Sequence, residues 1–341
     1  MMQKLQASEL NAAISLTDFT FKTTAELLDN AIAYQPNVHG WVAQSEAKKA
    51  ALFGLNMPQS GFNVLVLGAH GSGRTSLMHS AMFEVAKQTN SVPLNDLVAV
   101  YHFDQPNQPT LIKLPVGFGA KFKSEMDGFA RGLMMELPNF VAADNQQAML
   151  HAAEQWLIAA VSALQKSFET CETQLNQYIT LLRHEVMAYL KAWQAPPASE
   201  TDNAADNTLE GLISEPFFAR FRVNVLVDNR QTQTQHLNQA IVYDNDPSLQ
   251  SLFGGVESAS DASQMPDFLR LRVGNLHKAD GGMLLLHLRD LLGDDANGAQ
   301  MMEKLHRFCR NGTLQIEDAS SSALSTVCLP NNTLKIGRAH V

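Results

Sequence analysis

The sequence predicts an α/β fold in which a parallel sheet is interrupted by a long helical insertion. Three observations predict this class. A short apolar run at residues 62–67 leads into a glycine-rich loop and then a helical pattern, residues 141–195 contain neither glycine nor proline, and strand-like runs return after residue 221. Strand, glycine loop and helix form the first half of a βαβ unit, which is the building block of parallel sheets.

The composition is that of a globular protein without membrane segments. Hydrophobic residues make up 45% of the 341 residues, yet no apolar run reaches the length of a membrane span. The first ten residues, MMQKLQASEL, are not typical of a secretion signal, and three cysteines without a CxxC pair argue against disulfides or a zinc site. We therefore expect a cytoplasmic protein. The net charge of −9 disfavours nucleic acid as a partner, because phosphate binding depends on clustered Lys and Arg.

The glycine-rich loop has the spacing of a phosphate-binding loop. It matches G-x-x-x-x-G-K-[ST] except that arginine replaces lysine, and its candidate nucleotide-binding residues are Gly68, Gly71, Ser72, Gly73, Arg74 and Thr75. The glycines let backbone N–H groups converge on phosphate oxygens, and the following helix adds its positive end. The hydroxyl of Thr75 is placed to bind Mg²⁺. The guanidinium of Arg74 is planar and wider than an ammonium, so it cannot take the place of lysine unchanged.

An ATP site also needs an apolar strand that ends in acidic residues, which hold Mg²⁺ and help to position the reacting groups. The candidate strand is Met283–Leu286, but His287 and Leu288 stand where the acidic pair belongs, a degenerate Walker B motif. Asp290 comes two residues later, and we assign it to the start of the next helix. We expect hydrolysis to be absent and the binding of ATP and Mg²⁺ to be weak or lost. His70 and His287 are more typical of polar filler than of catalytic groups.

Residues 141–195 predict one long helix, preceded by Pro138 and closed by Pro196 and Pro197. Its apolar positions step by four and three residues, at Leu157, Val161, Leu164, Phe168, Cys171, Leu175, Tyr178 and Leu182. A heptad seam of this length indicates a coiled-coil arm, and the alternative is an ordinary buried helix. Residues 198–210 are small, acidic and polar, which indicates an exposed linker.

Several blocks resemble the Lon-related ATP-dependent proteases, a branch distinct from the housekeeping Lon enzyme. GNLHKADGGMLLLHLRDLL (274–292) is similar to the Lon segment that carries the Walker B strand, and QSEAKKAALFGL (44–55) is similar to the helix before the phosphate loop. VYHFDQPNQPTLIKLPVGFGAKF (100–122) resembles the proline- and glycine-rich signature of this branch. Together with RFRVNVLVDN and DNDPSLQSLFGGVE (244–257), these blocks cover most of residues 10–330 in the family's order.

The resemblance implies an AAA+ module with a coiled-coil insertion, followed by a Ser–Lys protease domain and assembled as a homo-oligomeric ring that threads protein substrates. It divides the chain into a helical segment (1–60), a first AAA+-like part (61–140), the coiled-coil insertion (141–197), an acidic linker (198–210) and a second AAA+-like part (211–334). No serine and lysine here can be assigned to the dyad, so we expect no protease activity. The degenerate Walker motifs lead us to expect no ATPase activity.

Three classes of function compete. The leading interpretation is the ATPase-like, substrate-handling module of a Lon-related serine peptidase. The alternative is a catalytically inactive AAA-like adaptor that holds partners with its coiled-coil arm. A P-loop kinase or transporter ATPase would need lysine at position 74 and acidic residues at positions 287 and 288, and neither is present.

The last seven residues, KIGRAHV (335–341), back-translate to AAGATCGGAAGAGCACACGTC, a common sequencing adapter. We interpret them as an adapter scar and leave them out of the predicted fold. The resemblance places the next strand between the strands at 62–67 and 283–286, so we expect a sheet that is incomplete at the C-terminus.

Overall fold

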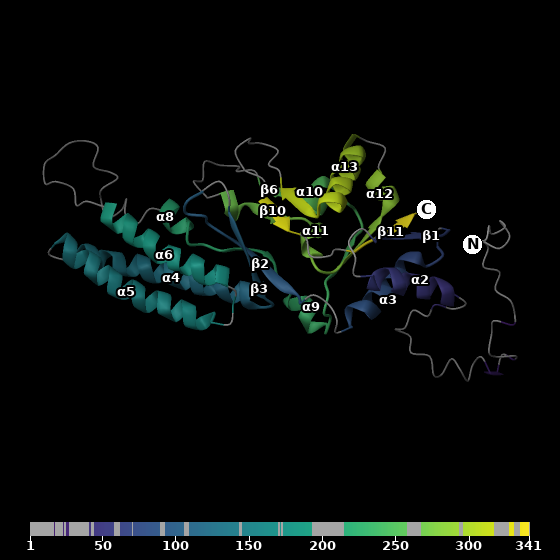
Figure 1. The fold of residues 1–341 in the computed structure, drawn as a ribbon, viewed down its shortest axis with the longest axis horizontal. Helices are drawn as coiled ribbons and strands as arrows, with labels where there is room; N and C mark the ends of the chain where they lie inside the picture. Colours follow the sequence, from purple (N-terminus) through teal and green to yellow (C-terminus); the bar gives the residue numbers. More distant parts are fainter. Residues whose placement is uncertain are drawn as a thin grey trace.

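The computed structural model describes most of the chain between residues 44 and 340. The described ranges are 44–57, 62–69, 71–88, 93–105, 109–142, 145–169, 173–192, 215–257, 267–292, 296–316, 327–330 and 335–340, with Cys171 and a few isolated residues before 44. A parallel sheet with helices on both sides lies at one end of the molecule, and a bundle of three helices projects from the other end (Figure 1). None of the described helices is long and apolar enough to cross a membrane.

The first sheet is parallel throughout and has the strand order β1-β11-β8-β5. These strands are β1 (Val64–Leu67), β11 (Lys335–His340), β8 (Met283–His287) and β5 (Ile241–Asp244). Because parallel strands all end at the same edge of a sheet, the glycine loop after β1 and the end of β8 lie together at the C-terminal edge. The expected α/β class is confirmed.

Strand β8 is buried on both faces, which explains its unbroken apolar run. Met283 and Leu285 pack with α2 (Ser45–Asn56) and α3 (Arg74–Ala86), while Leu284 and Leu286 pack with α13 (Ala296–Asn311). Successive side chains of a strand point to opposite faces, so this strand is apolar at every position rather than at every second one. The sheet is therefore the middle of three layers.

The second sheet is antiparallel and consists of β2 (Asn95–Val100) between β3 (Thr110–Pro115) and β4 (Asn224–Val227). One face packs on the helical bundle through Val98, Val100, Ile112 and Leu114. Its other face packs on the hairpin of β6 (Gly254–Val256) and β7 (Leu271–Val273) and on β9 (Thr313–Ile316). The second sheet thus connects the bundle to the rest of the molecule.

The remaining elements are short. They are α8 (Glu215–Ala219), α9 (Arg230–Thr234), α10 (Leu249–Phe253), a 3₁₀ turn at Asp267–Leu269, α11 (Asn275–Lys278), α12 (Leu288–Leu292) and β10 (Val327–Pro330), which pairs antiparallel with β9.

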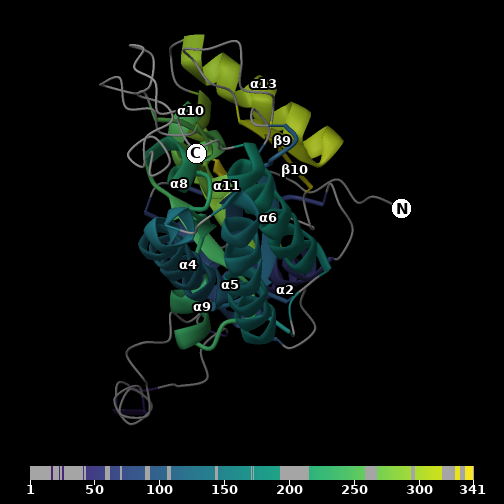
Figure 2. The same cartoon turned by 90° about the vertical axis from the view of Figure 1, so that its left-hand side faces the viewer.

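The expected single helix over residues 141–195 is wrong. The bundle consists of α4 (Phe118–Val141), which contains Pro138, followed by α5 (Gln146–Ser167) and α6 (Thr173–Ala192). Asn145 starts α5 with a side-chain cap, its Oδ1 accepting from the backbone N–H of Ala148 at 2.8 Å. An asparagine N-cap can start a new helix without any glycine or proline nearby. The absence of glycine and proline from residues 141–195 therefore did not guarantee one continuous helix. Helices α4, α5 and α6 lie side by side in both views (Figure 2).

The heptad seam marks the buried faces of two antiparallel helices. The bond from Gln146 Nε2 to the carbonyl of Lys191 joins the start of α5 to the end of α6, and the pair of Arg183 Nη2 and Glu154 Oε1, at 3.0 Å, joins the middles of the two helices. The seam residues that are buried are Leu157, Val161, Leu164 and Phe168 on one side of the turn and Leu175, Tyr178 and Leu182 on the other. They share a core with α4 and the second sheet, so the seam closes a bundle and does not form an extended arm.

The expectation that the last residues take no part in the fold is wrong for residues 335–340. They form β11, in which Gly337 pairs with Val64 of β1 on one side and with Leu285 of β8 on the other. This is the position in which we expected the missing strand. Sheet pairing uses backbone groups, so β11 supplies partners to both neighbours and the gap that we expected between them is closed.

Candidate functional site

The glycine loop lies between β1 and α3 at the C-terminal edge of the parallel sheet. Gly71 and Gly73 have φ angles of 78° and 75°, a conformation that residues with a Cβ rarely adopt. Gly73 is the N-cap of α3 and makes no side-chain cap bond, so the first N–H groups of α3 have no side-chain partner from the cap. The described part of the loop therefore has two left-handed glycines directly before a helix start, features that suit a phosphate group. His70 lies outside the described residues.

Arg74 folds back onto its own loop. Its Nη1 donates a hydrogen bond to the carbonyl oxygen of Gly68, and the backbone N–H of Ser72 donates to the carbonyl of Ala69 at 3.2 Å. A Cβ at Gly68 would come within 2.8 Å of the hydroxyl of Ser72, so the loop is tightly closed at this point. The cation in the lysine position is thus held by an internal backbone acceptor.

At the end of β8, His287 faces the first turn of α3. Its Nε2 lies 3.5 Å from Oγ1 of Thr75, at the outer limit of a hydrogen bond, and 2.7 Å from the hydroxyl of Tyr243 on β5. A ring nitrogen carries either one proton or one lone pair. The shorter contact therefore identifies Tyr243 as the hydrogen-bond partner of Nε2, and three elements meet at one imidazole.

The phenol of Tyr243 remains protonated at neutral pH. Partial burial raises its pKa above the ordinary value of 10.0, and the negative charge of Asp290 raises it further. A protonated phenol can donate its hydrogen to Nε2 of His287, which would place the imidazole proton on Nδ1. Asp290 lies in the first turn of α12, as the sequence predicted.

Asp244 is a buried carboxylate at the end of β5 that the sequence did not single out. It accepts from Nδ2 of Asn275 at 2.8 Å and from Oγ of Ser251 at 3.3 Å, which ties β5 to α10 and α11. Because neighbouring residues on a strand point to opposite faces, Asp244 lies on the face away from Tyr243. This carboxylate is used in packing and does not replace the missing acidic pair.

The residues at this edge fit a phosphate group but do not fit Mg²⁺. Glycines in the left-handed conformation, the start of α3 and Arg74 are all suited to a phosphate. Mg²⁺ prefers an octahedral set of oxygen ligands, whereas the hydroxyl of Thr75 faces a ring nitrogen that is already bonded to Tyr243. Within the described ranges, no group of three or more His, Cys, Asp and Glu side chains could hold a metal ion.

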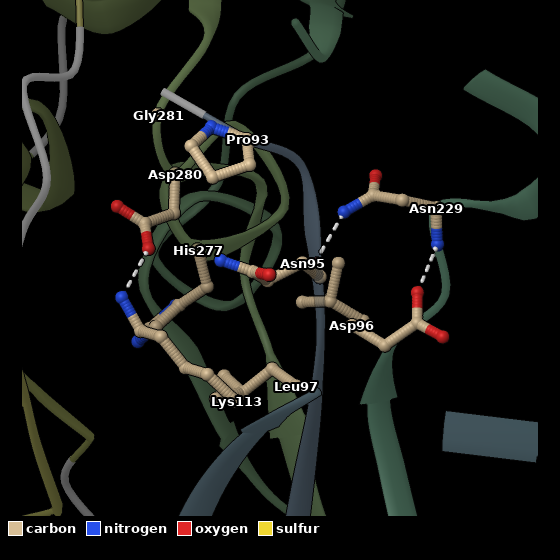
Figure 3. A pocket seen from close by; sticks show the side chains of 10 residues that line it. Pro93, Asn95, Asp96, Leu97, Lys113, Asn229, His277, Asp280 and Gly281 are labelled. Carbon is tan, nitrogen blue, oxygen red and sulfur yellow. Dashed lines mark hydrogen bonds and ion pairs between the residues drawn. The ribbon is translucent and has the colours of Figure 1, made fainter. Parts of the chain in front are cut away.

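A second hollow lies where the antiparallel sheet meets the turn that leads into β8. It has a volume of about 30 Å³, enough for one water molecule. Figure 3 shows His277 between the Lys113–Asp280 ion pair, which spans 3.0 Å, and Asn95. The His277 side chain is 5% exposed, both of its ring nitrogens lack a partner in the described structure, and burial lowers its pKa to about 3.

Asp96 lines the same hollow and joins the two turns that follow β3 and β4. Its Oδ2 accepts from the backbone N–H groups of Gly117 at 2.8 Å and Gly119 at 3.0 Å, and its Oδ1 accepts from that of Asn229 at 2.9 Å. Gly117 and Gly119 follow β3, and Asn229 follows β4. One fully buried carboxylate therefore fixes the start of the bundle relative to both outer strands.

A groove of about 550 Å³ runs along the outer face of α5 and α6. Its lining includes His151 and Glu154 from α5 and Arg183, His184 and Met187 from α6. Spacings of three and four residues place these side chains on one face of each helix. We call this surface the α5–α6 groove.

Comparison with known protein families gives two matches. Residues 238–337 match the family described as LonB-like, AAA domain, and residues 96–129 match the Lon-like LonC helical domain. A search of curated proteins finds no match. The first match includes β5, β8 and the first half of β11 but not the glycine loop, and the second covers β2 from Asp96, β3 and the first half of α4. Both matched families are Lon-like, and together the AAA and helical matches support a Lon-related AAA+ family for this chain.

Proposed function

We propose that this chain is the substrate-handling, ATPase-like module of a Lon-related serine peptidase and that it does not hydrolyse ATP. The observation that carries the proposal is the imidazole of His287, 3.5 Å from the hydroxyl of Thr75, at the end of β8. Hydrolysis needs carboxylates there to hold Mg²⁺ and to position the reacting groups. Leu288 next to it begins α12 and offers no oxygen ligand from its side chain.

We propose the glycine loop as a weak nucleotide-binding site. Its residues are Gly68, Gly71, Ser72, Gly73, Arg74 and Thr75, and Thr75 is the one that would have bound Mg²⁺. The bond from Arg74 to the carbonyl of Gly68 competes with any phosphate for the guanidinium, which supports weak binding. A phosphate that engages Arg74 has to replace or share this internal acceptor.

Protein substrates and a homo-oligomeric ring are the partners that the Lon-like matches support. We propose a cytoplasmic location. The net charge of −9 does not favour nucleic acid as the material handled.

The α5–α6 groove favours a second candidate, an inactive adaptor that binds a partner protein through its bundle. The groove is open and lined by charged side chains together with Met187, a lining suited to a polar and apolar protein surface. The two candidates differ in the fate of the bound protein, because a peptidase module delivers it for cleavage and an adaptor does not.

A phosphate-release assay tests the absence of hydrolysis. We expect the wild-type rate to equal that of Gly73→Val, in which a β-branched residue cannot adopt the φ of 75°. Arg74→Lys alone should remain inactive because the acidic pair is still missing. The triple variant Arg74→Lys, His287→Asp, Leu288→Glu restores the complete motif, and Arg74→Lys, His287→Asn, Leu288→Gln is its uncharged match.

Robust magnesium-dependent turnover by the wild-type chain, abolished by Gly73→Val, would overturn the proposal. Turnover by the triple variant but not by its uncharged match would identify the missing carboxylates as the cause of inactivity.

A further inference from the structure

We infer that the phosphate loop of this chain takes a phosphate-bearing ligand without a divalent metal ion, an inference that rests on the proposed nucleotide-binding role of the loop. The inference starts from one atom, Nε2 of His287, which lies near both Thr75 and Tyr243. Nε2 of His287 occupies the place opposite Thr75 and is already bonded to Tyr243.

The first step concerns the ligands available to a metal. The Thr75 hydroxyl lies 3.5 Å from the ring nitrogen of His287. Mg²⁺ binds through oxygen atoms and gives up its water reluctantly, so a hydroxyl next to an imidazole offers it little. Two acids lie near this edge: Asp244 points to the opposite face and is bonded to Asn275 and Ser251, and Asp290 lies in the first turn of α12 beyond the end of β8.

The second step concerns metals that accept nitrogen ligands. Coordination by Nε2 needs its lone pair, and the 2.7 Å contact with the hydroxyl of Tyr243 uses either that lone pair or a proton on the same atom. In both cases the bond to Tyr243 has to break before a metal can bind. Binding of a nitrogen-preferring metal at this position therefore requires loss of the bond to Tyr243.

The third step concerns what attracts the phosphate. The left-handed glycines and the start of α3 direct backbone N–H groups toward the loop, and Arg74 supplies a full positive charge. A free nucleotide presents more negative charge to these groups than its magnesium complex does. Without a protein group that holds the metal, the magnesium complex gains no contact that offsets this lost charge.

The test measures the affinity of the full chain for ADP by isothermal titration calorimetry, once with Mg²⁺ and once with EDTA. We expect wild-type ADP binding with EDTA to be at least as tight as with Mg²⁺, since no protein contact to the metal offsets the negative charge that Mg²⁺ neutralises. In His287→Asp a carboxylate faces Thr75, and Mg²⁺ should tighten ADP binding roughly tenfold, the effect of one charge-assisted contact. His287→Asn is the matched control, because it also loses the bond to Tyr243 but brings no charge and should show no gain with Mg²⁺.

Wild-type binding that requires Mg²⁺ overturns the inference, and so does an absence of ADP binding under both conditions. An equal response of the Asp and Asn variants to Mg²⁺ also overturns it, because the position opposite Thr75 would then not control the metal. The wild-type comparison keeps the test decisive if a variant does not fold. The phosphate-release assay is independent of these results, so failure of the inference is distinguishable from failure of the proposed function.

Discussion

Replacing Leu175 by alanine tests whether the bundle and the antiparallel sheet unfold as one unit. Leu175 is fully buried on α6, in a core that also contains Val98 of β2 and Ile112 of β3. Removing a buried leucine side chain costs about 2–5 kcal/mol, a large part of the roughly 5–15 kcal/mol that stabilises an ordinary domain. We therefore expect the loss of one side chain on α6 to weaken strands that are distant in the sequence.

Hydrogen exchange followed by mass spectrometry measures this effect segment by segment. In Leu175→Ala, amides of β2 and β3 should lose protection together with those of α5 and α6, and urea unfolding followed by circular dichroism should shift to lower denaturant. The control is Leu181→Ala on the same helix, because Leu181 is 47% exposed and its loss should change stability by about 0.5 kcal/mol or less. If the amides of α5 and α6 lose protection while those of β2 and β3 keep it, the bundle and the sheet do not share a core. The bundle would then be an independent arm.

Three further predictions concern the junction and the parallel sheet. Asp96→Asn turns one acceptor of the side chain into a donor, so at least one of the three backbone N–H groups loses its partner, and urea unfolding should show a cost of about 1–3 kcal/mol. His277 has a folded-state pKa of about 3 against an ordinary 6.5, so the unfolded chain alone takes up a proton between these values. Stability should therefore fall as the pH drops below about 6.5, by up to about 1.4 kcal/mol per pH unit, and His277→Leu should lose this share of the pH dependence in urea unfolding at pH 7.5 and 5.5. Gly337→Pro removes a backbone donor from the central strand β11. In a calorimetric scan the unchanged chain should melt cooperatively, and the variant should melt at a lower temperature or show no transition. An unchanged melting temperature would show that β11 contributes no pairing.

Local patterns predicted the elements that local forces determine. The apolar run at β8, the strand and helix on either side of the glycine loop, and the position of Asp290 after the strand end all follow from short-range sequence signals. The heptad seam also identified the buried side chains of α5 and α6 correctly. It did not show that the chain turns between them, because a heptad pattern is the same whether its helix is continuous or folded back.

The parts that escaped prediction depend on contacts between segments that are distant in the sequence. Tyr243 reaches His287 only because β5 pairs with β8. One sequence on its own does not reveal which strands are neighbours. Asp96 and His277 have ordinary sequence surroundings, and their burial follows from the packing of the antiparallel sheet against the turn before β8. Strand β11 was misjudged for another reason, since sheet pairing depends on the backbone and is indifferent to how the residues originated.

The order of the strands also means that the chain leaves the parallel-sheet part after α3 and returns to it before β5. Asn238 joins these two points by hydrogen bonds. Its backbone N–H donates to the carbonyl of Ala86 at 2.7 Å, and its side chain donates to the carbonyls of Lys87 and Gln88 at 3.2 and 3.1 Å. The match to the AAA domain begins at this same residue. The antiparallel sheet and the bundle are thus an inserted unit with adjacent ends, and a short bridge from Gln88 to Asn238 would leave β1, β5, β8 and β11 in the same order. Removal or exchange of the whole unit would therefore leave the connections of the parallel sheet unchanged.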